Sequence, residues 1–240
     1  MLWTLLGIPL LICVTTTRCD AHVKCSLSGG ESACFYAYGN AGVTYTLLED
    51  KTTGTKVEAT FMSLAEGNKT LQEPAVDKVR FVNKRIEMNV SMKKISIQDI
   101  STGHVTNYAW DAIGYGNNGV TSAPDGITFA SQHHGLEINV PGSLTLRFRR
   151  SINQFDFVVK NIELKSLGGF SGEVCTARFN TAIKAGLEHR DNSHLAGELL
   201  VLDTFLVPAK LKFGCYTPFK QEEKDITYLL LQRHRLPAHA

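Results

Sequence analysis

The chain has 240 residues and a formal net charge of +2 at pH 7, with charged residues making up 20% of it. Because these charges are interspersed, we expect no strongly basic face of the kind that binds nucleic acid. After the first residues, no apolar run approaches the roughly twenty residues that span a bilayer. We therefore expect no membrane-spanning segment, and a fold that rests on a hydrophobic core with the six cysteines as a supplement.

The N-terminus resembles a secretory signal peptide. Leu2–Val14 is a mostly apolar run of the length of a signal-peptide core, too short to span a membrane. The polar residues that follow offer small side chains at the positions read by a signal peptidase, with cleavage after Thr17 or after Ala21. We expect the signal peptide within residues 1–21 and a secreted, extracellular protein; the alternative is a buried N-terminal helix.

The cleavage position decides how many cysteines the mature protein keeps. A cut after Ala21 leaves an even number that can pair fully in an oxidising compartment, namely Cys25, Cys34, Cys175 and Cys215. Three pairings are possible, and the most local one joins the first two to each other and the last two to each other. A cut after Thr17 also keeps Cys19, and this fifth thiol would favour a disulfide-linked oligomer.

Two acceptor triplets for N-glycosylation agree with secretion. They begin at Asn68 (Asn-Lys-Thr) and at Asn89 (Asn-Val-Ser), and neither has proline in the middle position. We therefore predict a glycoprotein.

Alternation of apolar and polar residues dominates the chain after the signal. Period two places alternate side chains on opposite faces, which is typical of strands with one buried face. The runs are Val43–Glu49, Lys56–Leu64, Lys78–Asn83, Arg85–Ser91, Lys94–Ile100, Gly126–Ser131, Leu136–Val140, Ser143–Arg150 and Phe155–Leu164. Because short turn signals separate them, we predict a mainly β protein, an antiparallel sandwich or barrel-like domain.

One long polar segment interrupts this series. Gly114–Gly126 is rich in residues that tolerate positive φ, and long loops often carry function. The alternative is an ordinary connection between strands. The candidate binding residues of this loop are Tyr115, Asn117, Asn118 and Asp125.

The last third of the chain has a different character. We expect the glycines of Ser166–Cys175 to serve a tight turn or a close approach of the backbone. We also expect a short helix over Thr176–His189 and a buried strand pair over Leu195–Val207. The order of acidic and then basic residues in Glu222–Arg235 suits a helix dipole. These elements predict one β-rich domain over residues 22–220, followed by a helical or flexible tail over 221–240, with one or two short helices in this third.

Catalytic motifs are incomplete. Ser171 lies in Gly-Phe-Ser-Gly but lacks the second glycine of a nucleophile elbow. His189, Asp191 and His194 form the best constellation for a hydrolase site, although their spacing matches no common zinc motif. We expect no cofactor and no metal, and keep a secreted hydrolase built on these three residues as the alternative function.

A basic strand face is the candidate for binding an anionic partner. In strand register Arg147 and Arg149 point away from the apolar side chains of Ser143–Arg150 and could meet an anionic polysaccharide. The same residues form an Arg-x-Arg-Arg pattern that resembles a processing site ending at Arg150. An amphipathic strand explains the pattern equally well.

Gly135–Asn180 runs as paired strands, then a glycine turn, then Gly172, Val174 and Cys175, and shortly afterwards Phe179 and Asn180. This stretch resembles the core of von Willebrand factor type D-like domains, including the C-terminal module of inter-alpha-trypsin inhibitor heavy chains. The resemblance implies an extracellular β-rich binding or assembly module.

These features together predict a secreted, non-catalytic binding or assembly protein of an extracellular matrix, egg coat or body fluid. Its expected partner is another protein or an anionic glycan. A pore-forming β protein is a third class, but Lys78–Ile100, its one stretch of suitable length, carries many charges.

Overall fold

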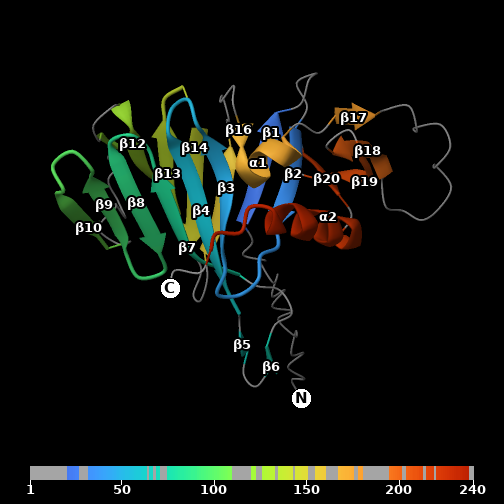
Figure 1. Cartoon of the computed structure of the whole chain (residues 1–240), viewed down its shortest axis with the longest axis horizontal. Helices are drawn as coiled ribbons and strands as arrows, with labels where there is room; N and C mark the ends of the chain where they lie inside the picture. The colour runs from blue at the N-terminus through green and yellow to red at the C-terminus, as the bar shows by residue number, and fades with distance from the viewer. Residues whose placement is uncertain are drawn as a thin grey trace, which may run out of the picture.

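Strands account for most of the chain that the computed structural model describes (Figure 1). The described residues are 21–26, 32–63, 65–66, 69–70, 75–109, 120–122, 126–132, 135–142, 144–150, 155–160, 167–175, 178–180, 195–201, 204–212, 215–218 and 220–237. The predicted mainly β, sandwich-like fold with short helices in the C-terminal third is confirmed.

The first layer runs in the order β10-β9-β8-β7-β4-β3-β16, with all neighbours antiparallel. Successive hairpins build it, which is why order in space follows order along the chain from β7 to β10. Its strands are β3 (Thr44–Asp50), β4 (Thr55–Met62), β7 (Ala75–Val82), β8 (Ile86–Ser91), β9 (Ile95–Asp99), β10 (Val105–Tyr108) and β16 (Leu167–Gly168).

The second layer runs β11-β12-β13-β14-β15-β1-β2-β20-β19-β18-β17. It is antiparallel except where β1 meets β15 and where β2 meets β20, which are parallel contacts. Its strands are β1 (Ala21–Ser26), β2 (Ser32–Ala37), β11 (Val120–Ser122), β12 (Thr128–Gln132), β13 (Gly135–Val140), β14 (Leu144–Arg150), β15 (Phe155–Lys160), β17 (Arg178–Asn180), β18 (Leu195–Val201), β19 (Phe205–Lys212) and β20 (Cys215–Pro218).

A single residue pair, Phe155 with Val76, joins the two layers in one hydrogen-bonded ladder. A separate small hairpin of β5 (Ala65–Glu66) and β6 (Lys69–Thr70) extends away from both layers (Figure 1).

The core lies between the layers and follows from the alternation along each strand. In β8, for example, Ile86, Met88 and Val90 are buried, whereas the residues between them lie on the other face. In β14, Leu146 and Phe148 contribute to the same buried cluster. In these two strands, the apolar residues of the alternating pattern are the ones that face the core.

Two helices extend the core beyond the edge of the first layer that β3 and β16 form. α1 (Gly169–Val174) packs on β3 and β1, and α2 (Lys220–Gln232) packs on β2, β3 and β19 (Figure 1). Leu230 and Leu231 of α2 and Phe170 of α1 belong to the buried cluster. The C-terminal helix is thus part of the core.

The edge of β3 that faces away from β4 is covered by other segments of the chain at each end of the strand. Leu167 and Gly168 of β16 pair with Asp50 and Glu49 at one end. At the other end the chain leaving α2 lies along β3, where the Thr46 amide donates to the His234 carbonyl at 2.9 Å and the Leu236 amide donates to the Thr44 carbonyl at 2.9 Å. Covering an edge in this way prevents it from pairing with another chain.

The glycine-rich segment forms α1 instead of a tight turn, for a reason that lies in its surroundings. Gly169 has φ of +72°, and a Cβ there would meet the Thr46 carbonyl oxygen at 3.1 Å and the β3 backbone beyond it at 3.2 Å. A Cβ on Gly172 would lie against the Leu167 carbonyl. Gly169 therefore allows the helix to approach β3, and Gly172 allows it to approach Leu167 of β16, more closely than any side chain would permit.

The four cysteines form two disulfides, Cys25–Cys175 and Cys34–Cys215. The most local pairing is wrong because β1 and β2 form a hairpin in which Lys24 lies opposite Cys34 and Cys25 lies opposite Ala33. Opposite residues share a face and adjacent ones do not. The Cys25 and Cys34 side chains consequently point to opposite faces and cannot bond.

Three further expectations need correction. Arg178–Asn180, placed in a predicted helix, form β17 and pair with β18. The predicted loop Gly114–Gly126 contains β11, where β-branched Val120 and Thr121 pair with β12. The hairpin β1–β2 was not predicted at all, although Val23 and Phe35 are buried in it.

Candidate functional site

The outward face of the first layer is an ordered polar surface. One cross-strand row crosses it from Thr46 through Glu58, Arg80, Asn89 and Ser96 to Asn107, each residue opposite the next. Directly opposite side chains lie close enough to interact. The row therefore brings together polar side chains from β3, β4, β7, β8, β9 and β10.

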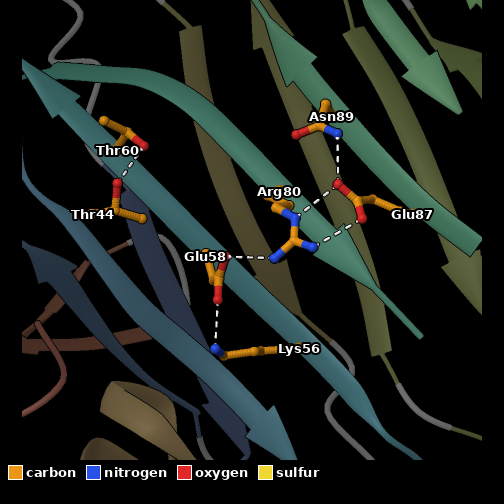
Figure 2. A network of polar contacts seen from close by, with 7 residues as sticks. All are labelled: Thr44, Lys56, Glu58, Thr60, Arg80, Glu87 and Asn89. Carbon is orange, nitrogen blue, oxygen red and sulfur yellow. Dashed lines mark hydrogen bonds and ion pairs between the residues drawn. The ribbon is translucent and has the colours of Figure 1, made fainter. Parts of the chain in front are cut away.

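Charged residues of this row and its neighbours form one network (Figure 2). Arg80 binds Glu87 through two hydrogen bonds of 2.9 Å each and donates to Glu58 at 3.1 Å. Glu58 also pairs with Lys56, and the Asn89 amide donates to Glu87 at 3.1 Å. The charges of the network balance, because the carboxylates of Glu58 and Glu87 offset the guanidinium group of Arg80 and the ammonium group of Lys56.

The network shifts the acid–base behaviour of its members. Hydrogen bonds from Arg80 lower the pKa of Glu87 to about 2, because they stabilise the carboxylate form more than partial burial destabilises it. The hydrogen bond to Glu87 likewise raises the pKa of Arg80. Both groups are charged throughout the physiological range, so this ion pair persists across that range.

Three hairpin turns lie side by side at one end of the same sheet. They are residues 51–54 between β3 and β4, 83–85 between β7 and β8, and 100–104 between β9 and β10. The Lys84 side chain lies against Gly54, whose added Cβ would meet it at 3.4 Å. The Ile100 amide donates to the Arg85 carbonyl at 2.7 Å. The three turns therefore form one continuous edge.

Two aspartates build the outer turns of this edge. Asp50 accepts hydrogen bonds from the Thr52 amide and the Thr53 hydroxyl, and Asp99 accepts from the amide and hydroxyl of Ser101. Such side-chain contacts to the next residues are a common way to stabilise a turn. Both carboxylates thus point into their own turns.

The pKa values of these aspartates reflect this geometry. Burial alone would raise the pKa of Asp50, but the hydrogen bonds from Thr53 and Thr52 outweigh it and lower the pKa. The hydrogen bonds from Ser101 lower the pKa of Asp99. Asp50 thus binds its turn through both carboxylate oxygens, and Asp99 binds its turn through Oδ1.

Basic side chains are left on the outside of the edge. We call Lys51, Lys84, Arg85 and His104 the turn row; all four are exposed. Strands lie about 4.7–4.9 Å apart, so successive hairpins are separated by roughly 10 Å. The turn row therefore places the Lys51 cation and the Lys84 and Arg85 cations on neighbouring hairpins along a line, with the His104 imidazole on the third.

The predicted basic face of β14 has acidic neighbours. Arg147 is exposed, and the register places Glu137 of β13 directly opposite it. Asp156 of β15 occupies the position opposite Arg149. Because opposite charges at facing positions attract, this face is less cationic than β14 alone indicates.

Several predicted site residues lie outside the described part of the chain. They are the loop residues Tyr115, Asn117, Asn118 and Asp125, the glycosylation candidate Asn68, Cys19, and the alternative hydrolase residues His189, Asp191 and His194. Predictions on them stay predictions.

Asn89, the second glycosylation candidate, lies on the outward face of β8 and is half-buried. Its side-chain nitrogen, the atom that would carry a glycan, donates to Glu87 in the network. Ser171 is fully buried within α1, so it offers no exposed hydroxyl to a substrate.

A scan against models of protein families gives no match, and a search of curated proteins gives none either. Within the described ranges, no helix is long and apolar enough to cross a membrane. In the same ranges, no cluster of three or more histidine, cysteine or acidic side chains is arranged to hold a metal ion. The sequence indicates Lys84 and Arg85, with Lys93 and Lys94, as further basic residues that could meet an anionic polysaccharide, but only the register places Lys51 and His104 beside the first two and Lys93 and Lys94 at the other end of the sheet.

Proposed function

We propose that this protein is a secreted, non-catalytic binding module of an extracellular matrix, egg coat or body fluid, and that it recognises an anionic polysaccharide through the turn row. The observation that carries the proposal is the arrangement of the three adjacent turns. Lys51, Lys84 and Arg85 are exposed there, while Asp50 and Asp99 direct their carboxylates into the turns.

A linear polyanion fits this arrangement better than a compact anion does. Cations spread across hairpins roughly 10 Å apart can each contact a different charge along an extended chain. Long-range attraction between such a row and a polyanion also favours encounter. Since Glu137 faces Arg147 across the β13–β14 pair, the turn row replaces the basic strand face of β14 as the favoured site.

The extracellular part of the proposal rests on the signal-like N-terminus and on the two disulfides, which persist in oxidising compartments. A relation to von Willebrand factor type D-like domains and glycans at Asn68 and Asn89 belong to the same proposal. Intact-mass analysis and peptide mapping of protein made in a eukaryotic cell test this part. Retention inside the cell with unmodified asparagines would contradict it.

Binding is tested on immobilised heparin, a highly sulfated polysaccharide, by the salt concentration needed for elution. Lys84→Gln/Arg85→Gln should elute at clearly lower salt and bind about tenfold more weakly, because each exposed charge contact contributes up to about 1 kcal/mol. Lys93→Gln/Lys94→Gln is the matched control, since it removes two exposed cations from the hairpin turn at the opposite end of the sheet.

Three results are possible, and each decides the proposal. A larger loss in the turn-row variant than in the control supports the site. Equal losses in the two variants would mean that heparin responds only to net charge. A wild-type protein that passes through the column at low salt would exclude the polysaccharide altogether.

A further inference from the structure

The two edges of the first layer differ in whether another segment of the chain pairs with them. The edge at β3 is covered by β16 and by residues 234–236. At the opposite edge, β10 pairs with β9 alone among the described residues. This contrast, which is independent of the turn row, directs attention to β10.

β10 contains no lysine, proline or bulge of its own, and the lysine beside it, Lys94, contacts it only through the Asn107 side chain among the described residues. Natural edges are commonly blunted by lysine, proline or a bulge. β10 reads Val-Thr-Asn-Tyr, and its register with β9 is unbroken from Val105 to Tyr108. Val105 is 47% exposed, and Ile100 in the adjoining turn is 46% exposed. An uncharged, regular edge with exposed aliphatic side chains favours strand addition.

The hydrogen-bond pattern identifies the backbone groups that are available. The Asp99 amide donates to the His104 carbonyl, so residue 104 directs its carbonyl toward β9. In an antiparallel pair this direction alternates along the strand. The backbone groups of Thr106 and Tyr108 therefore face β9, and those of Val105 and Asn107 face away from it.

We propose that β10 is a self-association edge, where a second copy of this chain adds its own β10 in antiparallel orientation. Two-fold pairing centred on Thr106 would place Val105 of each copy opposite Asn107 of the other. The outward amide and carbonyl of each residue then meet their complements. β10 itself carries no charge, so the only cation at the pairing residues among those described is the exposed Lys94 ammonium group, which donates to the Asn107 side chain at 3.4 Å and must turn toward solvent when the second copy binds.

A four-residue edge gives a small contact, so the association should be concentration-dependent. Sedimentation velocity on full-length secreted protein carrying Cys19→Ser, which removes a disulfide route to dimers, measures it directly. We expect the weight-average sedimentation coefficient to rise with protein concentration toward the value of a dimer.

The decisive variant is Asn107→Pro. Proline at this position removes an amide that faces away from β9, so the β9–β10 pairing is retained, as is typical of proline on edge strands. The dimer dissociation constant should rise at least tenfold without loss of thermal stability. Thr106→Pro is the contrasting control, because it removes an amide that faces β9 and should lower the melting temperature.

Val105→Lys tests the same edge without altering the backbone, and it should also weaken the dimer at least tenfold. Two results would overturn the proposal. One is a wild-type protein that stays monomeric across the whole concentration range. The other is dimerisation of Asn107→Pro and Val105→Lys with wild-type affinity, which would place the contact elsewhere.

Discussion

Glu58 is an outward-facing carboxylate that is only 5% exposed. The stems of Lys56 and Arg80 cover it, and their charged ends bind it. A carboxylate removed from water is tolerated when it is paired and hydrogen-bonded. The polar face therefore depends on the network in Figure 2, in which side chains from three strands are joined by ion pairs.

Arg80→Leu should lower the free energy of unfolding by about 2–4 kcal/mol, because Glu87 loses its main partner and the buried Glu58 keeps only Lys56 of its two. Glu58→Leu should cost less than about 1 kcal/mol, because Arg80 keeps Glu87 and an apolar side chain fits the covered position. Urea denaturation of both variants measures the difference. A greater loss for Glu58→Leu would contradict this account.

Glu87 should make stability depend on pH in the acid range. Its pKa is about 2 in the folded protein against an ordinary value of 4.5. A lowered folded pKa stabilises the protein above pH 4.5, and this contribution is lost as the pH falls from 4.5 toward 2. In Glu87→Gln the free energy of unfolding should change less steeply over that window, as measured by urea titrations at stepped pH. If the two proteins gave parallel curves of unfolding free energy against pH, Glu87 would not be the group that makes stability depend on pH.

At the scale of elements, α1 and β3 depend on each other. α1 is too short to be stable alone, and it forms where Gly169 lets it reach the β3 backbone and Gly172 lets it pack against the Leu167 carbonyl of β16. Beside it, the Tyr45 hydroxyl of β3 accepts hydrogen bonds from the Asn40 amide at 3.1 Å and from Gln232 of α2 at 3.2 Å. β3 is thus the one strand of the first layer, besides β16, on which the two helices pack among the described residues.

Two glycines with similar backbones separate conformational strain from close approach. Gly169 and Gly103 have φ of +72° and +70°, but a Cβ on Gly103 would meet nothing within 4 Å. Gly103→Ala should cost about 1 kcal/mol, the price of the left-handed conformation. Gly169→Ala should cost at least about 2 kcal/mol, because β3 must also move. Equal melting temperatures in the two variants would contradict the close approach.

Elements with clear alternation could be predicted from the sequence, and those that depend on a neighbour could not. β8 and β14 were found because Ile86, Met88, Leu146 and Phe148 repeat with period two. The hairpin β1–β2 was missed because its apolar positions include cysteine and alanine, which are weak signals beside a signal peptide. α1 was missed because its glycines argue against a helix until β3 is placed next to them.

For the whole molecule, the turn row and the layer order were beyond sequence reasoning. Lys51 and Lys84 are far apart along the chain, and only the pairing of β4 with β7 brings their turns together. The parallel contact of β2 with β20 joins residues from near the two ends of the domain. Alternation along a strand reports which face is buried, but it carries no information about which strand lies beside it.

The disulfides can be tested at the same scale. Peptide mapping without reduction should recover Cys25–Cys175 and Cys34–Cys215. Replacing Cys34 and Cys215 together with serine should lower the free energy of unfolding by about 2–5 kcal/mol, since this bond closes a very long loop in the unfolded chain. Recovery of Cys25 bonded to Cys34 would mean that the β1–β2 hairpin does not form as described.

These two bonds also determine what proteolysis would produce. Each of them spans the Arg-x-Arg-Arg pattern that ends at Arg150, with one cysteine before it and one after it. A protease that cut there would generate two polypeptides that stay covalently joined. The product would run as one species on a non-reducing gel and separate into two fragments only after reduction, so a cleaved form would pass as intact protein in any assay that leaves the disulfides in place.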